Sequence, residues 1–111
     1  FQNFLFEQDA ELQVATVKSI YSLLYDELDK KFKALANSNR RKILLYLKDN
    51  QKCAGDIAGQ ISLSMASVSY HLSVLKNAQI ISSNQKGGYI FYQLRHKEIE
   101  ELLEWLNTLL A

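Results

Sequence analysis

The sequence contains no proline and only four glycines among 111 residues, which disfavours a turn-rich β architecture and favours helices. Its single cysteine, Cys53, excludes an internal disulfide and indicates a reducing compartment, so we expect a cytoplasmic protein. No apolar run approaches the ~20 residues that span a bilayer, and no secretory signal pattern opens the chain. Because residue 1 is Phe, we expect the natural start of the protein to be missing or trimmed.

Features that enzymes commonly share are also missing. The sequence has no glycine-rich phosphate loop, no paired-carboxylate pattern and no nucleophile–base set. A length of 111 residues with 48% hydrophobic content suits one folded domain with a single modest core. We therefore expect residues 1–111 to form one non-enzymatic domain that needs no cofactor, no metal and no small-molecule substrate.

Charge is distributed unevenly along the chain. Residues 1–29 hold six acids and one base, a net charge of −5, whereas residues 30–97 hold twelve Lys or Arg and two acids, a net charge of +10. Residues 98–111 hold four Glu and no base, a net charge of −4. A basic middle between acidic ends indicates that the middle contacts a polyanion, so double-stranded DNA is the leading partner.

The stretch from Ser64 to Ala78 predicts a DNA-reading helix. Ser64 is a good N-cap, and apolar residues recur at Val68, Leu72 and Leu75, the spacing of one buried helical stripe. The opposite face has no carboxylate and consists of small or hydrogen-bonding residues, which suit base edges in a major groove. These are Ala66, Ser69, Tyr70, Ser73 and Asn77.

Upstream of this stretch the pattern predicts two further helices. Asn37 is a candidate N-cap for a helix over residues 38–47, whose first turns carry Arg40 and Arg41. Cations are unfavourable at that end of a helix dipole, so either phosphates or a solvated basic turn must account for them. A short helix over residues 54–60 follows a polar turn at 49–52, which makes residues 54–78 a helix-turn-helix.

Downstream, the residue periodicity changes to that of strands. Residues 80–83 and 89–94 are β-type runs, and Asn84 to Gly88 is predicted as the loop between them, so residues 80–94 form a hairpin wing. Residues 96–110 then predict a last helix, whose acidic first turns suit its dipole. The predicted fold class is mainly α (α+β): a winged helix-turn-helix of about five helices with a two-stranded β-hairpin wing.

Residues 9–35 contain no Gly or Pro and predict one long N-terminal helix. Its apolar stripe is larger than one small domain needs, and the last helix carries a second stripe, so we expect both to dimerise the protein. The expected dimerisation residues are Leu12, Ile20, Leu24, Leu28, Leu102, Leu106 and Leu109.

Four segments together resemble the ArsR family of bacterial winged helix-turn-helix repressors: FKALANSNRRKILLYL, AGDIAGQI, SVSYHLSVLKNAQII and GGYIFYQL. They cover about residues 32–94 in the family's order and spacing, and they look most like its SdpR-type autorepressor branch. The resemblance implies a homodimer that binds an operator of two related half-sites, without a metal site and under the control of a membrane antirepressor protein.

The family's DNA-facing positions fall on Met65, Ala66, Ser69 and Tyr70, with Lys86 in the wing. Polar Gln and Ser commonly stand where Met65 and Ala66 are here, so we expect readout to depend on thymine methyl groups and DNA shape. The full set of residues expected to contact DNA is Arg40, Arg41, Ser64, Met65, Ala66, Ser67, Ser69, Tyr70, Ser73, Lys76, Lys86 and Gly87.

Rival interpretations stay open from sequence alone. A thiolate metal site needs a Cys-x-Cys pair, but Cys53 is followed by Ala54 and Gly55, and the last helix holds one imidazole, His96. Cys53 at a helix N-terminus beside a lysine also suits a redox switch, and a winged helix without DNA binding suits a protein-interaction module. His71 lies near the apolar stripe, so we expect a packed, hydrogen-bonded histidine.

Overall fold

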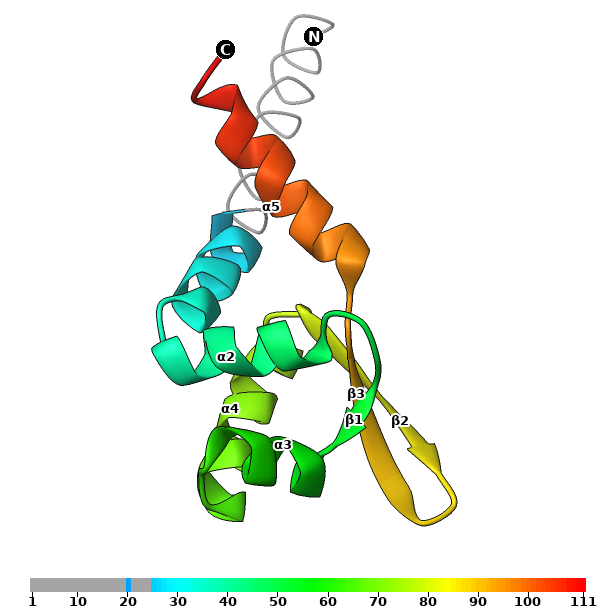
Figure 1. The fold of residues 1–111 in the computed structure, drawn as a ribbon. Helices are drawn as coiled ribbons and strands as arrows, with labels where there is room; N and C mark the ends of the chain where they lie inside the picture. The colour runs from blue at the N-terminus through cyan, green and yellow to red at the C-terminus, as the bar shows by residue number, and fades with distance from the viewer. Residues whose placement is uncertain (1–19, 21–24) are drawn as a thin grey trace, which may run out of the picture.

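The structure, a computed structural model, describes residue 20 and residues 25–111 (Figure 1). The predicted helix start at residue 9 and the expected interface residues Leu12 and Leu24 lie outside the described residues. A helical segment over residues 25–35 comes first, followed by elements in the order of a winged helix-turn-helix, which confirms the predicted fold class. These are α2 (Ser38–Leu47), β1 (Lys52–Cys53), α3 (Ala54–Ile61), α4 (Met65–Asn77), β2 (Ile81–Lys86), β3 (Tyr89–Leu94) and α5 (His96–Thr108).

Both predicted N-caps begin their helices. The Asn37 side-chain oxygen accepts a hydrogen bond from the Arg40 amide at 3.1 Å, which starts α2. The Ser64 hydroxyl oxygen accepts one from the Ser67 amide, also at 3.1 Å, which starts α4. Each cap satisfies one of the backbone donors that a helix leaves unpaired in its first turn.

The core lies where α2, α3, α4 and the start of β2 meet. The predicted apolar stripes of these helices are buried, and the strand contributes Ile81 beside Ile80. Each such side chain contributes about 1.5–3 kcal/mol on burial. The largest fully buried side chains are Ile43, Leu47, Ile57, Val68, Leu75, Ile80 and Ile81.

The sheet differs from the prediction in having a third strand. Lys52 and Cys53 form β1, which pairs antiparallel with β3 in the register Lys52↔Tyr92 and Cys53↔Phe91, so the strand order is β1-β3-β2. From its sequence Lys52 is expected in a polar turn, because a two-residue strand has no periodicity that could reveal it. Its pairing ties the start of α3 to the wing.

The predicted loop from Asn84 to Gly88 is wrong, because Asn84 and Lys86 belong to β2. The strands pair as far as Lys86↔Tyr89, and the turn consists only of Gly87 and Gly88. Their φ angles of 56° and 85° are positive, as a type I′ turn requires at both central residues. The hairpin projects from the domain (Figure 1), so the side chains at its tip need not be buried. Polar residues of β2 can therefore extend its pairing with β3.

The last helix packs against the segment over residues 25–35. The rings of Phe32 and Trp105 meet edge to face with centroids 5.4 Å apart, and Leu102 is buried. The helix ends at Thr108, whereas the prediction extended it to residue 110. In the described part of the chain, no helix combines the length and apolar character that crossing a membrane requires.

Candidate nucleic-acid interface

Helix α4 exposes the face that the sequence analysis assigned to DNA. Val68, Leu72 and Leu75 anchor its other side in the core. Met65 is 52% exposed and Tyr70 is 63% exposed, so neither is held by the core. The remaining expected α4 contacts are also exposed, namely Ala66, Ser69, Ser73 and Lys76, while Ser64 is exposed at the cap and Ser67 is half-buried.

The two ends of α4 are fixed by left-handed residues. Before it, Ser62 adopts φ 60°, and the Leu63 amide donates to the Ala58 carbonyl at 3.2 Å, closing the turn between α3 and α4. After it, Gln79 adopts φ 63°, and the Ile80 amide donates to the Leu75 carbonyl at 3.1 Å. This second arrangement is a Schellman motif, with both apolar partners buried. The reading helix is thereby held at a fixed angle to α3 and to the wing.

The wing combines one basic residue with exposed apolar ones. Lys86 and Gly87 are exposed at the tip, beside the turn. Tyr89 is 64% exposed and Ile90 is 49% exposed, and the sequence analysis did not single out either as a functional residue. Both residues directly follow the Gly-Gly turn, and this position could have indicated their exposure. The tip of a hairpin lies too far from the core for both side chains to be buried. The wing can therefore contact a groove through apolar as well as charged groups.

The electrostatics around α4 suit a polyanion. Residues 57–97, which include all of α4, β2 and β3, contain no Asp or Glu. The same range contains four basic residues, Lys76, Lys86, Arg95 and Lys97. Any phosphate that approached this surface would therefore meet attraction or neutrality, without a carboxylate on α4 or the wing to repel it.

The two arginines at the start of α2 have partners inside the protein. The Arg40 Nε donates to the Ala34 carbonyl at 2.7 Å, and Arg41 Nη1 donates to the Leu35 carbonyl at 2.8 Å. These carbonyls end the helical segment over residues 25–35, where cations are favourable. From the sequence, either phosphates or a solvated basic turn was expected to account for these cations. The structure gives a third reason, which is their hydrogen bonds to the carbonyls that end the preceding helical segment. Arg41 is exposed, whereas Arg40 is half-buried.

His71 is buried on the core side of α4, as predicted. It is 8% exposed, and its Nδ1 lies 3.4 Å from Arg40 Nη1. Burial lowers the pKa of His71 below its ordinary value of 6.5, and the positive charge of Arg40 lowers it further. The neutral imidazole is therefore the form that fits this position.

Cys53 is the N-cap residue of α3, as the sequence analysis expected, and its thiol donates to the Asp56 carboxylate at 3.2 Å. That neighbour is an anion, whereas the ammonium of Lys52 points to the Tyr46 ring, 5.1 Å from its centroid. Within residue 20 and residues 25–111, no group of three or more His, Cys, Asp or Glu side chains lies close enough to hold a metal ion.

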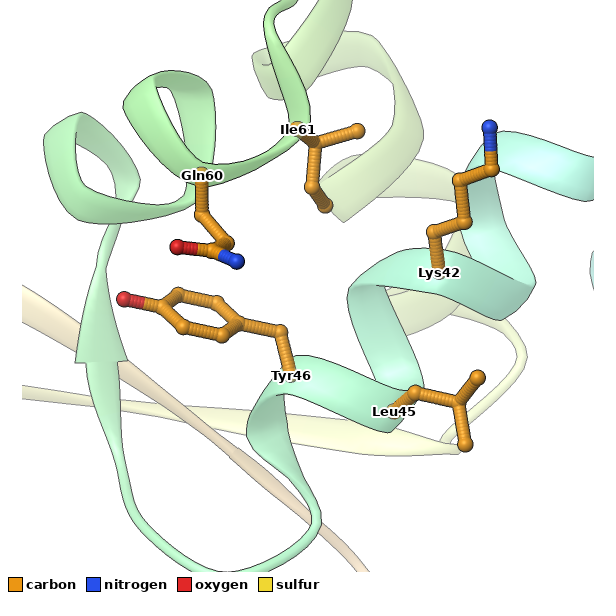
Figure 2. Close-up of a pocket in the computed structure, with 5 residues that line it drawn as sticks. All are labelled: Lys42, Leu45, Tyr46, Gln60 and Ile61. Carbon is orange, nitrogen blue, oxygen red and sulfur yellow. The ribbon is translucent and has the colours of Figure 1, made fainter.

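A pocket of about 470 Å³ lies between α2 and α3. Figure 2 shows the Gln60 amide from α3 beside the Tyr46 ring from α2, with Lys42 and Leu45 further along α2 and Ile61 at the end of α3. Leu45 is 68% exposed. No residue of α4 or of the wing lines this pocket, so it is a feature separate from the reading face.

Apolar side chains are exposed along α5, at the residues that follow it and on the N-terminal helical segment, and we refer to them together as the apolar surface. Leu102 is buried within its own protomer, but the expected interface residues Leu106 and Leu109 are 44% and 66% exposed, and Ile20 is 51% exposed. Leu28, which is half-buried, helps line an open pocket of about 230 Å³ between the two helices. Further exposed apolar residues on this surface are Tyr25, Leu103, Trp105 and Leu110.

Comparison with known proteins adds to this geometry. Residues 37–83 match the sequence model described as bacterial regulatory protein, arsR family. The chain is 41% identical over 75 residues to the transcriptional repressor SdpR of Bacillus subtilis (strain 168), covering 68% of this chain and 83% of that protein.

Two solved structures share the fold. One is an ArsR-like transcriptional regulator from Rhodococcus sp. RHA1, with a TM-score of 0.73 and 26% identity, covering 78% of this chain and 79% of that chain. The other is the homodimeric winged helix-turn-helix DNA-binding domain of Mb0332 from Mycobacterium bovis, a possible ArsR-family transcriptional regulator. It has a TM-score of 0.69 and 22% identity, covering 80% of this chain and 82% of that chain.

Proposed function

Because this chain belongs to the arsR family of bacterial regulatory proteins, we propose that it represses transcription as a homodimer on an operator of two related half-sites. It is a winged helix-turn-helix DNA-binding regulator and not an enzyme. A repressor must reach chromosomal DNA, so the proposal includes a cytoplasmic location.

The exposed face of α4 is the observation that carries the proposal. Ser69 and Tyr70 offer hydrogen-bonding groups, and Met65 and Ala66 offer apolar contact to thymine methyl groups. Lys76, Lys86 and Arg41 are exposed and supply phosphate contacts, which position the protein without reading sequence. Ser64, Ser67, Ser73 and Gly87 complete the proposed contact set, whereas Arg40 acts indirectly through its partners inside the protein.

The apolar surface on α5 and the N-terminal helical segment is the proposed dimer interface. One reading helix covers only a few base pairs, so specific binding needs two of them about one helical turn apart, ~34–36 Å. The homodimeric state of the Mycobacterium bovis domain supports this assembly. The acidic ends of the chain suit an interface that faces away from the phosphates.

Selection of duplexes from a random-sequence library tests the function. Bound duplexes should share two related half-sites whose centres lie about one helical turn apart. Titration of a selected duplex and of random duplex at two salt concentrations should then separate specific from nonspecific binding. A protein-interaction module that has lost DNA binding would enrich no sequence and bind neither duplex.

We propose that a membrane antirepressor protein, and not a metal ion, triggers release of the DNA. The first part extends the resemblance to the SdpR-type branch. The second is supported by Gly55, which stands two residues after Cys53 where a second thiolate would be needed. Zinc, arsenite and cadmium at one ion per subunit should leave the operator complex intact in a mobility-shift titration. Release that is abolished by Cys53→Ser would contradict this part of the proposal.

A further inference from the structure

We infer that His71 and Arg40 form a proton-sensitive link that positions the reading helix, and that the protein binds its operator with His71 neutral. This inference rests on the proposed function and adds a regulatory input to the same site. The link joins α4 to the end of the helical segment over residues 25–35, which belongs to the proposed dimer interface.

The geometry fixes the protonation state of His71 when its bond with Arg40 is formed. Arginine carries only hydrogen-bond donors, so the Arg40 Nη1 that lies 3.4 Å from His71 Nδ1 must donate to it. Nδ1 therefore presents a lone pair, and the ring proton of the neutral histidine is on Nε2. A protonated His71 has donors on both nitrogens and cannot accept this bond.

The same guanidinium holds the preceding helix. Arg40 Nε donates to the Ala34 carbonyl at 2.7 Å, and Arg40 Nη2 donates to the Lys33 carbonyl at 3.1 Å. A single planar side chain thus connects three helices: its own α2, the end of the segment over residues 25–35, and α4. Since His71 directly follows Ser69 and Tyr70 on α4, the link lies behind the proposed base-reading residues.

Among the described residues, no neighbouring negative charge would compensate a positive charge on His71. Arg40 is the charged group that reaches His71 from α2, and among the described residues no carboxylate forms an ion pair with the imidazole. Asp56, the single acid of α3, accepts from Cys53 instead, and the neighbouring aromatic group on α4, Tyr70, is a neutral phenol with its centroid 5.5 Å away. A second cation would therefore face Arg40 at a position where only 8% of the His71 surface is exposed.

The sign of the effect follows from this arrangement. Since burial and Arg40 both lower the pKa of His71, protonation favours conformations in which α4 has moved from α2. Two reading helices fit two half-sites only if their spacing is fixed, so a loosened link lowers operator affinity. The link is complete above the ordinary histidine pKa of 6.5 and is lost as the pH falls below it toward the lowered value.

Operator affinity measured from about pH 5.5 to pH 8 at constant ionic strength tests the inference. Affinity should fall below about pH 6.5, by no more than about a hundredfold per pH unit, because the dimer carries two His71 side chains and each takes up one proton. In His71→Asn the side-chain Oδ1 stands where His71 Nδ1 was and can still accept from Arg40, but it does not titrate, so this dependence should disappear. The chain has one other histidine, and His96→Gln is the matched control, because His96 is exposed and its Nε2 lies 3.2 Å from the Lys48 carbonyl. That control should keep the wild-type slope.

Nuclear magnetic resonance titration of the wild-type protein keeps the test independent of variant folding. Without DNA, the amide signals of residues 33–35 and 40 should change with pH in parallel with the ring signals of His71. With operator bound, the pKa of His71 should fall, whereas the charge of nearby phosphates alone would raise it. Equal pH slopes in wild type and His71→Asn, or a rise of this pKa on the operator, would overturn the inference. Absence of specific binding at every pH would instead contradict the proposed function.

Discussion

Lys31 Nζ lies 3.4 Å from Glu98 Oε2, and the two side chains are only 9% and 11% exposed. The pair joins the helical segment over residues 25–35 to α5. Glu98 Oε1 also lies 3.4 Å from Arg95 Nη2, and the Arg95 amide donates to the Ile80 carbonyl at 2.8 Å. One carboxylate therefore connects the two proposed dimerisation helices with the base of the wing.

Loss of one member of this pair should be costly. Glu98→Gln leaves the Lys31 ammonium buried without a countercharge, and we expect a loss of about 3–5 kcal/mol in the free energy of unfolding. The double replacement Lys31→Met with Glu98→Leu removes both charges, and it should recover most of the loss. Urea unfolding of Lys31→Met, of Glu98→Leu and of the double variant measures the coupling. Additive losses would contradict a direct interaction.

The left-handed Gln79 predicts a simple gain in stability. A residue with a Cβ costs about 1–2 kcal/mol at φ 63°, and glycine avoids this cost. Glycine also loses more conformational freedom on folding, which lowers stability by about 0.5–1 kcal/mol. Gln79→Gly should therefore raise the free energy of unfolding by up to about 1 kcal/mol. The matched control is Gln85→Gly in β2, where φ is not positive, and it should lower stability by about 0.5–1 kcal/mol. A loss in both variants would mean that the Gln79 side chain makes a stabilising contact.

Local signals made the reading helix predictable. Its cap at Ser64 and its buried residues Val68, Leu72 and Leu75 lie within one short stretch, so spacing alone identified which side faces the core. The two glycines at 87 and 88 likewise indicated a hairpin. The predicted strand was too short, because Asn84 and Lys86 are exposed to solvent, where strand pairing does not require hydrophobic side chains.

Sequence patterns could not predict contacts between residues that are far apart in the chain. Lys31 and Glu98 read as ordinary surface charges of two amphipathic helices, and nothing in either helix indicates that they meet. Lys52 pairs with Tyr92 only because the whole wing returns beside α3. The role of Arg40 was missed for the same reason, since a helix dipole argument applied to α2 alone ignores the carbonyls that end the neighbouring segment.

Base readout and phosphate contact should respond differently to mutation. Ser69→Ala and Tyr70→Ala should each weaken operator binding by about 1–3 kcal/mol and random-duplex binding much less. Lys86→Ala should weaken both duplexes alike and lower the salt slope by about one.

Fluorescence anisotropy at several salt concentrations measures these differences. The control is Ser38→Ala, which removes an equally exposed helical hydroxyl from α2 and should leave both affinities unchanged. Equal losses on operator and random DNA for the α4 variants would place base readout on another surface.

The exposed apolar residues of α5 should hold the dimer together. Leu106 is 44% exposed in the protomer, on the surface that includes Trp105 and Leu109, and it lies outside the buried core. Leu106→Glu places a charge in the proposed interface, where it would be buried without a partner. We expect a folded monomer whose operator affinity falls to the nonspecific level, about 10³-fold or more below wild type.

Leu45→Glu is the matched control for this substitution. Leu45 is 68% exposed on α2, away from α5 and the N-terminal segment, so the same change there should leave the dimer and operator binding intact. Leu102→Ala should act differently again, because Leu102 is buried in its own protomer and its truncation costs about 2–5 kcal/mol of stability. Sedimentation and thermal unfolding separate the three outcomes. A Leu106→Glu protein that stays dimeric and binds the operator at full affinity would place the interface elsewhere on the molecule.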